Sequence, residues 1–91
     1  MKRLIDYNLT KDEIRQIFGS QKNFEHNLEW YAKDIESERD NEKFDIAYLL
    51  FLRGKREESR KMLESIEDEE YRQECLEDSI AWGAEPGCIV N

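Results

Sequence analysis

Hydrophobic residues recur along this chain at the three- and four-residue spacing of α-helices. In residues 21–38 the successive spacings are four, three and four, at Phe24, Leu28, Tyr31 and Ile35. Such a pattern makes one side of a helix apolar and leaves the opposite side polar. We therefore predict one amphipathic helix over residues 21–38.

Capping signals divide other parts of the chain into short helices. Thr10 and Glu13 have the spacing of a capping box, and Gly19 is placed to end the helix that follows. A nearly continuous apolar run from Phe44 to Leu52 stops just before Gly54, which predicts a buried central helix that begins near residue 40 and ends at Arg53. Period alone would also allow a strand there, but the terminal glycine and the helical neighbours favour a helix.

Two more helices are predicted after Gly54. The first covers residues 56–66, and the second follows Asp68, which can cap it. The expected packing stripe of the last helix is Tyr71, Cys75, Leu76, Ser79, Ile80 and Trp82. The sequence thus predicts a single all-α domain over residues 1–91, a small bundle of about five short helices. Residues 1–9 are expected to be an extended arm packed on the helices, and residues 84–91 a tail.

Composition limits the classes of partner. The chain has 91 residues, 40% of them charged, and a formal net charge of −8. Binding to DNA, RNA or an anionic membrane needs a basic face, so we expect neither direct nucleic-acid binding nor membrane binding. No apolar stretch approaches the roughly 20 residues that span a bilayer, and the first residues lack the apolar core of a secretion signal, which predicts a cytoplasmic protein.

Negative charge is concentrated in residues 64–78, where eight carboxylates face a single arginine, Arg72. Acidic residues in the first turn of the last helix are stabilised by the helix dipole and need no functional explanation. Glu74, Glu77 and Asp78 lie toward the opposite end, where like charges one turn apart cost about 0.2–0.5 kcal/mol per pair. These three residues indicate a surface for a cationic protein, with a simply solvated face as the alternative.

A second group of acidic residues brackets the junction between the second and third predicted helices. Its members are Asp34, Glu36, Glu38, Asp40, Glu42 and Asp45. Trp30 lies off the apolar stripe of its helix, and an exposed tryptophan beside carboxylates is typical of an interface anchor, although a second buried face would also explain it. The predicted partner-binding residues are Glu64, Glu67, Glu70, Glu74, Glu77, Asp78, Trp30, Asp34 and Glu38.

Residues that carry out chemistry are sparse. His26 is the only histidine and is expected on the polar side of its helix. Cys75 and Cys88 are far apart and lack the additional His and Cys ligands that a zinc site requires. Residues 88–91 have the form of a prenylation box, but the final asparagine is unusual and the preceding segment is acidic, so we interpret them as an ordinary tail. We predict a non-catalytic protein without metal or cofactor.

Residues 43–71 resemble one tetratricopeptide repeat, a helical hairpin with small residues where its helices cross. The matching positions are Ile46, Ala47, Leu50, Gly54, Ser59 and Leu63. The sequence departs from the motif at Lys43, Ile66 and Tyr71, and a generic helical hairpin is the alternative. The resemblance implies an adaptor that grips a peptide or helix in a groove beside Tyr48, Phe51, Arg53 and Arg56.

In size, charge and helical character the chain is similar to the immunity proteins and antitoxins of bacterial toxin systems. That resemblance implies a basic partner, a toxin of the nuclease type, whose active-site cleft the acidic face would cover. Carboxylates would take the positions of substrate phosphates, and long-range attraction would speed association. A homodimer is a further possibility, because a second copy of the chain could cover the very apolar third helix.

Overall fold

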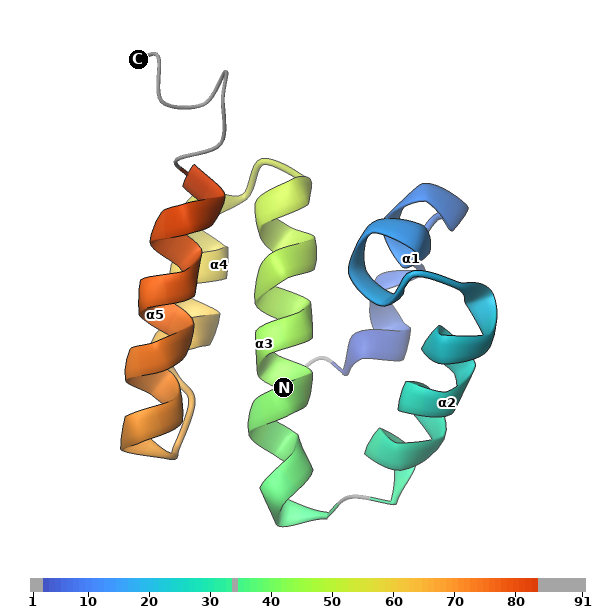
Figure 1. Ribbon diagram of the computed structural model, residues 1–91, viewed down its shortest axis with the longest axis horizontal. Helices are drawn as coiled ribbons and strands as arrows, with labels where there is room; N and C mark the ends of the chain where they lie inside the picture. The colour runs from blue at the N-terminus through green and yellow to red at the C-terminus, as the bar shows by residue number, and fades with distance from the viewer. Residues whose placement is uncertain (1–2, 34, 84–91) are drawn as a thin grey trace.

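Helices make up nearly all of the described chain (Figure 1). The computed structural model describes residues 3–33 and 35–83, apart from the side chain of Ser37. The elements are the 3₁₀ helix η1 (Leu4–Tyr7) and the α-helices α1 (Lys11–Phe18), α2 (Gln21–Ala32), α3 (Glu36–Leu52), α4 (Arg56–Glu64) and α5 (Glu69–Gly83). Those residues contain no strand, which confirms the all-α prediction. None of these helices is long and apolar enough to cross a membrane.

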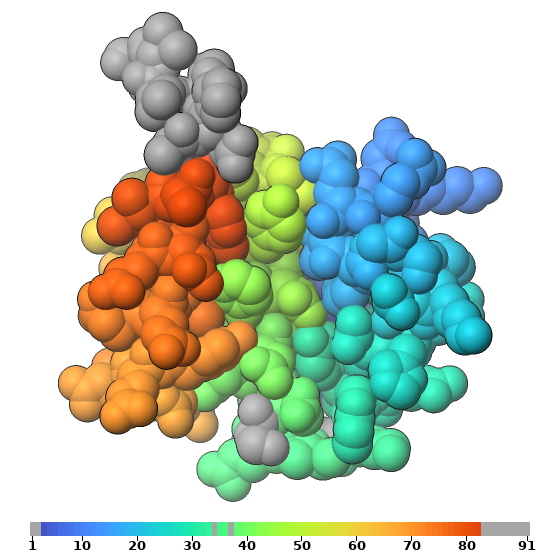
Figure 2. Space-filling model, in the orientation of Figure 1, coloured from blue at the N-terminus to red at the C-terminus, as the bar shows by residue number. Residues whose placement is uncertain are grey.

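Helix α3 lies in the centre, with α1 and α2 on one side and α4 and α5 on the other (Figure 1). Side chains of α3 remain visible between the two flanking pairs on the face shown in Figure 2. Ile46 and Leu50 of α3 belong to the apolar cluster formed with η1, α1 and α2, whereas Ala47 belongs to the cluster formed with α4 and α5. The continuous apolar run of α3 is therefore covered on two sides within one chain, and the run by itself no longer indicates a dimer.

The α3–α4 hairpin has the tight crossing that its small residues predict. Ser59 is buried, and its hydroxyl donates a hydrogen bond of 2.6 Å to the carbonyl of Ala47. Gly54, in the turn, has φ +82°, a conformation that residues with a Cβ rarely adopt. The backbones can approach here because neither helix presents a large side chain at the crossing.

The predicted capping box of α1 is confirmed. Thr10 accepts from the backbone N–H of Glu13, and Glu13 accepts from the backbone N–H of Thr10. The same Glu13 carboxylate pairs with the Arg53 guanidinium at 2.8 Å, which ties α1 to the end of α3 and lowers the Glu13 pKa to about 2. Gly19 ends the helix with φ +86°.

The predicted boundary between the second and third helices was wrong. α2 ends at Ala32, and α3 already begins at Glu36, where Ile35 occupies the N-cap position and is 37% exposed. The break lets α2 lie beside α3 and bury Tyr31 near Ile46, which the local spacing could not indicate.

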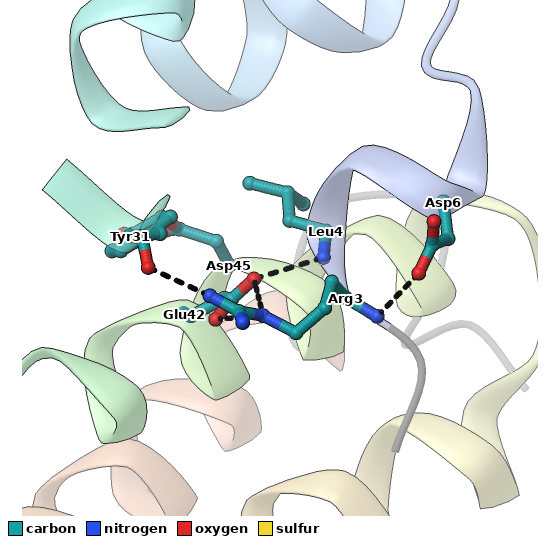
Figure 3. A network of polar contacts seen from close by, with 6 residues as sticks. All are labelled: Arg3, Leu4, Asp6, Tyr31, Glu42 and Asp45. Atoms are coloured by element: carbon teal, nitrogen blue, oxygen red, sulfur yellow. Dashed lines mark hydrogen bonds and ion pairs between the residues drawn. The ribbon is translucent and has the colours of Figure 1, made fainter. Parts of the chain in front are cut away.

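The N-terminal arm is packed as predicted, but it is not extended. Residues Leu4–Tyr7 form η1, and Leu4 is fully buried. The turn forms because the backbone N–H of Arg3 donates to the Asp6 carboxylate and the N–H of Asp6 donates to the Arg3 carbonyl. Figure 3 shows how Glu42 then accepts from the Leu4 N–H and from the Arg3 guanidinium, each at 3.0 Å.

Helix α5 packs on α3 and α4, with one correction to its predicted stripe. Cys75 is buried, and Trp82 meets Phe44, Tyr48 and Phe51 with ring centroids 4.9–5.7 Å apart. Ile80, however, is 72% exposed, because it lies about 100° around the helix from Ser79 and therefore points away from the core face. The predicted tail, with Cys88, lies outside the described residues.

Candidate functional site

A polar cleft lies on the face where α3 is flanked by α2 and α5, and its volume is about 480 Å³. Asn41, Phe44 and Asp45 of α3 line it together with Asn27 and His26 of α2. Tyr71 contributes the α5 wall, and the end of α1 closes one side. The cleft brings four helices to one place, which is a common arrangement for ligand sites in small helical domains.

Asp45 is the most perturbed acidic group of this cleft. Its carboxylate accepts a hydrogen bond from the hydroxyl of Tyr31. Burial raises the pKa of Asp45 to about 6, the Tyr31 hydrogen bond opposes that rise, and the neighbouring Glu42 carboxylate adds to it. Burial also raises the pKa of Tyr31, with the Asp45 charge as a further cause, so the tyrosine remains a hydrogen-bond donor.

We expect Asp45 to reduce stability at neutral pH. A pKa above the unfolded value means that the folded state binds the proton more tightly, so stability falls as pH rises from about 4 to about 6 and is then level. Asp45→Asn keeps an acceptor for the Tyr31 hydroxyl and removes the desolvated charge. The variant should be about 1–3 kcal/mol more stable at pH 7, with the difference shrinking toward pH 4, in urea unfolding followed by circular dichroism. A less stable variant at pH 7 would instead show that the carboxylate is structural.

Other carboxylates near the cleft have structural partners. Glu42 is 3% exposed and bonded to Arg3 and Leu4. Asp40 accepts from the backbone N–H groups of Glu67 and Asp68, and so holds the α4–α5 connection. Three members of the second acidic group, Asp40, Glu42 and Asp45, are therefore bonded inside the fold and do not add to an exposed negative surface.

An acidic stripe of four residues runs along the solvent side of α5. We define the stripe as Glu70, Glu74, Glu77 and Asp78, which are all exposed and follow the spacing of one helix face. Within the described residues none of the four side-chain carboxylates forms a hydrogen bond or ion pair. Arg72 forms no ion pair with the stripe, and its guanidinium instead donates to the carbonyl of Ile66 at 2.8 Å, at the start of the α4–α5 connection.

The remaining predicted binding residues do not join this stripe. Glu64 ends α4 and pairs with Arg60 at 3.3 Å, and Glu67 lies in the connection before α5. Glu38 lines the polar cleft, where it accepts from the Asn41 amide at 3.0 Å. Asp34 lies outside the described residues.

Trp30 is exposed as the interface interpretation requires, at 40%. It lies on α2, on the other side of α3 from α5 (Figure 1). The Lys33 ammonium stands 4.5 Å from the centre of its ring. Trp30 is three and four residues from Asn27 and His26, which line the polar cleft, so it lies on the cleft side of α2, whereas the stripe lies on α5.

An apolar groove of about 390 Å³ separates α4 from α5. Ile80, Leu76 and Phe51 line it, and Arg56 and Arg60 line it from α4. The Arg56 guanidinium lies 5.5 Å from the centre of the Phe51 ring. Ile80, which was expected to pack in the core, instead lines this groove and is exposed there.

The described residues contain no group of three or more His, Cys, Asp or Glu side chains arranged for a metal ion. His26 is exposed at the cleft wall. Cys75 is a free buried thiol, and burial raises its pKa. Comparisons with protein-family models, curated proteins and solved structures gave no match for this chain.

Sequence reasoning missed the cleft, although one signal pointed to it. Asp45 is a carboxylate between Phe44 and Ile46, inside the apolar run of α3. A charged residue in a buried run requires a partner or a function. The partner, Tyr31, comes from another helix, so the sequence could mark the position but not its surroundings.

Proposed function

We propose that this protein is a non-catalytic binding protein whose acidic surface docks a basic partner protein. The observation that supports the proposal is the stripe of α5, whose four carboxylates are exposed and have no internal partner within the described residues. Their mutual repulsion is a cost that a cationic partner would relieve.

The partner is most simply a toxin of the nuclease type, which makes the protein an immunity protein or antitoxin. A nuclease presents cationic side chains to substrate phosphates, and a row of carboxylates along a helix can occupy the same positions. Such binding inhibits by covering the cleft and gains a fast association rate from electrostatic steering. The chain itself would then need no catalytic group.

Affinity capture with three forms of the tagged chain tests the proposal. The forms are the wild type, the stripe variant Glu74→Lys/Glu77→Lys/Asp78→Lys, and the control Glu25→Lys/Glu57→Lys/Glu58→Lys. Both triples change the formal net charge of −8 by the same six units, and the control residues are exposed on α2 and α4. We expect a basic protein that the wild type and the control retain at low salt, that high salt elutes, and that the stripe variant loses.

The captured protein then allows a kinetic measurement. The stripe variant should associate at least about tenfold more slowly at low ionic strength, and the difference should shrink in high salt. Inhibition of a nuclease activity of that protein would establish the toxin assignment. Equal capture by the stripe variant and the control would contradict the assignment of the binding face.

A second function is favoured by the groove between α4 and α5. An adaptor of the repeat-like kind could hold an apolar segment there against Ile80, with acidic residues of the ligand facing Arg56 and Arg60. Two of the groove residues expected from the sequence are already engaged, since Tyr48 packs on Trp82 and Arg53 pairs with Glu13. Glu77 also lines this groove, so the discriminating stripe change is Glu74→Lys/Asp78→Lys, which lies outside the groove lining. Binding that Ile80→Glu abolishes and this double variant keeps would indicate the second function.

A further inference from the structure

The polar cleft has a charge pattern of its own. Two carboxylates, Glu38 and Asp45, line it, and no lysine or arginine does so among the described residues. The neighbouring Glu42 carboxylate does not line the cleft and is paired with Arg3 at 3.0 Å. An unneutralised acidic cleft attracts a cationic group.

We propose that this cleft receives the guanidinium group of an arginine side chain carried by the partner. The inference rests on the proposed function for the source of that side chain, because a basic protein supplies exposed arginines. The cleft's chemistry is independent of the stripe, since Asp45 and Asn41 lie on α3 and the stripe lies on α5.

Aromatic and amide groups favour arginine over lysine. The rings of Phe44 and Tyr71 line the cleft, with centroids 6.4 Å apart, and a planar guanidinium can lie against such rings. Asn41 donates its amide N–H to Glu38, which leaves its amide oxygen as an acceptor. A guanidinium has five N–H donors for these oxygens and the Asp45 carboxylate, whereas an ammonium has three and no plane.

Desolvation gives the cation a source of binding energy. The Asp45 carboxylate is partly buried and has one donor partner, Tyr31, among the described residues. An arriving guanidinium would add charge-assisted hydrogen bonds to an acceptor that has already lost part of its hydration. Asp45 is expected to reduce the stability of the free protein at neutral pH. Binding residues often carry such a cost, and here a bound cation would offset it by pairing with the carboxylate.

A titration with N-acetyl-arginine-N-methylamide, followed by ¹H–¹⁵N NMR of the full chain, tests the inference. The neutral isostere N-acetyl-citrulline-N-methylamide and the lysine analogue serve as comparison ligands. One side chain should bind with a Kd in the millimolar range, so the titration extends to about 50 mM. We expect saturable shifts at amides of α2, α3 and Tyr71 with the arginine compound, at least threefold weaker binding of the lysine compound, and no saturation with citrulline.

Two matched variants locate the site. Asp45→Asn retains an acceptor for Tyr31 and should weaken binding of the arginine compound at least about tenfold. Glu57→Gln removes an equal charge at an exposed position of α4 and should leave binding unchanged. The spectra of both variants report whether the fold is intact. No shifts with the wild type, equal binding of citrulline, or undiminished binding by a folded Asp45→Asn variant would each overturn the inference.

Binding should also weaken as pH falls through about 6, because a protonated Asp45 cannot pair with a cation. The titratable and charged groups around it are Tyr31 and His26 of α2, Glu38 and Glu42 of α3, Tyr71 of α5, and Arg3 before η1. His26→Gln should keep this pH dependence, and Asp45→Asn should lose it. A pH dependence that follows His26 instead would contradict the role of Asp45.

Failure of this inference and failure of the proposed function are distinguishable. The stripe variant should still bind the arginine compound within about twofold at 0.3 M salt, where charges on α5 are screened from the cleft. Capture of a basic protein that Asp45→Asn does not weaken would leave the proposed function in place and overturn the cleft as its arginine site.

Discussion

Glu42→Ala is expected to lower the free energy of unfolding by about 3 kcal/mol, a large part of the roughly 5–10 kcal/mol that stabilises a domain of this size. The Glu42 carboxylate is 3% exposed and accepts from the Arg3 guanidinium and from the Leu4 backbone N–H, each at 3.0 Å. Removing it leaves the buried Leu4 N–H without its acceptor and Arg3 without its counter-charge. η1 would then lose its polar attachment at Leu4, while the packing of Leu4 on Ile46 and the hydrogen bond from Arg53 to the Tyr7 carbonyl remain.

Urea unfolding followed by circular dichroism measures this loss. Glu57→Ala is the matched control, because Glu57 is exposed on α4 and its removal should cost less than about 0.5 kcal/mol. A double-mutant cycle with Arg3→Ala should show a coupling of at least about 1 kcal/mol. Equal stability of Glu42→Ala and the control would mean that the network does not hold η1.

Trp82→Ala should lower the free energy of unfolding by about 2–4 kcal/mol. The indole is the contact through which the last turns of α5 meet α3, with ring centroids 5.4 Å from Phe44, 4.9 Å from Tyr48 and 5.7 Å from Phe51. Truncation removes these contacts and leaves a cavity that three partly buried rings cannot readily fill.

Trp30→Ala provides the same chemical change at an exposed site. Trp30 is 40% exposed and contacts Lys33, so its truncation should cost less than about 1 kcal/mol. Thermal and urea unfolding by circular dichroism compare the two variants without relying on tryptophan fluorescence. A larger loss for Trp30→Ala than for Trp82→Ala would reverse the assignment of the two residues.

The acidic residues show how far sequence reasoning extends toward function. The helix dipole and the like-charge spacing single out Glu74, Glu77 and Asp78 in the sequence, and the structure places them with Glu70, a first-turn residue, on one exposed face of α5. Glu42 looked equivalent in the sequence, yet its partners lie 38 and 39 residues away. A carboxylate with a distant partner cannot be told from a solvated one by local pattern.

The helical class, the Thr10 capping box, the Gly19 and Gly54 stops and the small residue Ser59 at the hairpin crossing could all be predicted from the local sequence. These features depend on hydrogen bonds and sterics within about four residues, which a local pattern records. The position of the break between α2 and α3, the exposure of Ile80 and the cleft around Asp45 emerge only when the helices pack. Those outcomes depend on which helix packs against which, and burial is set by contacts between residues far apart in the chain.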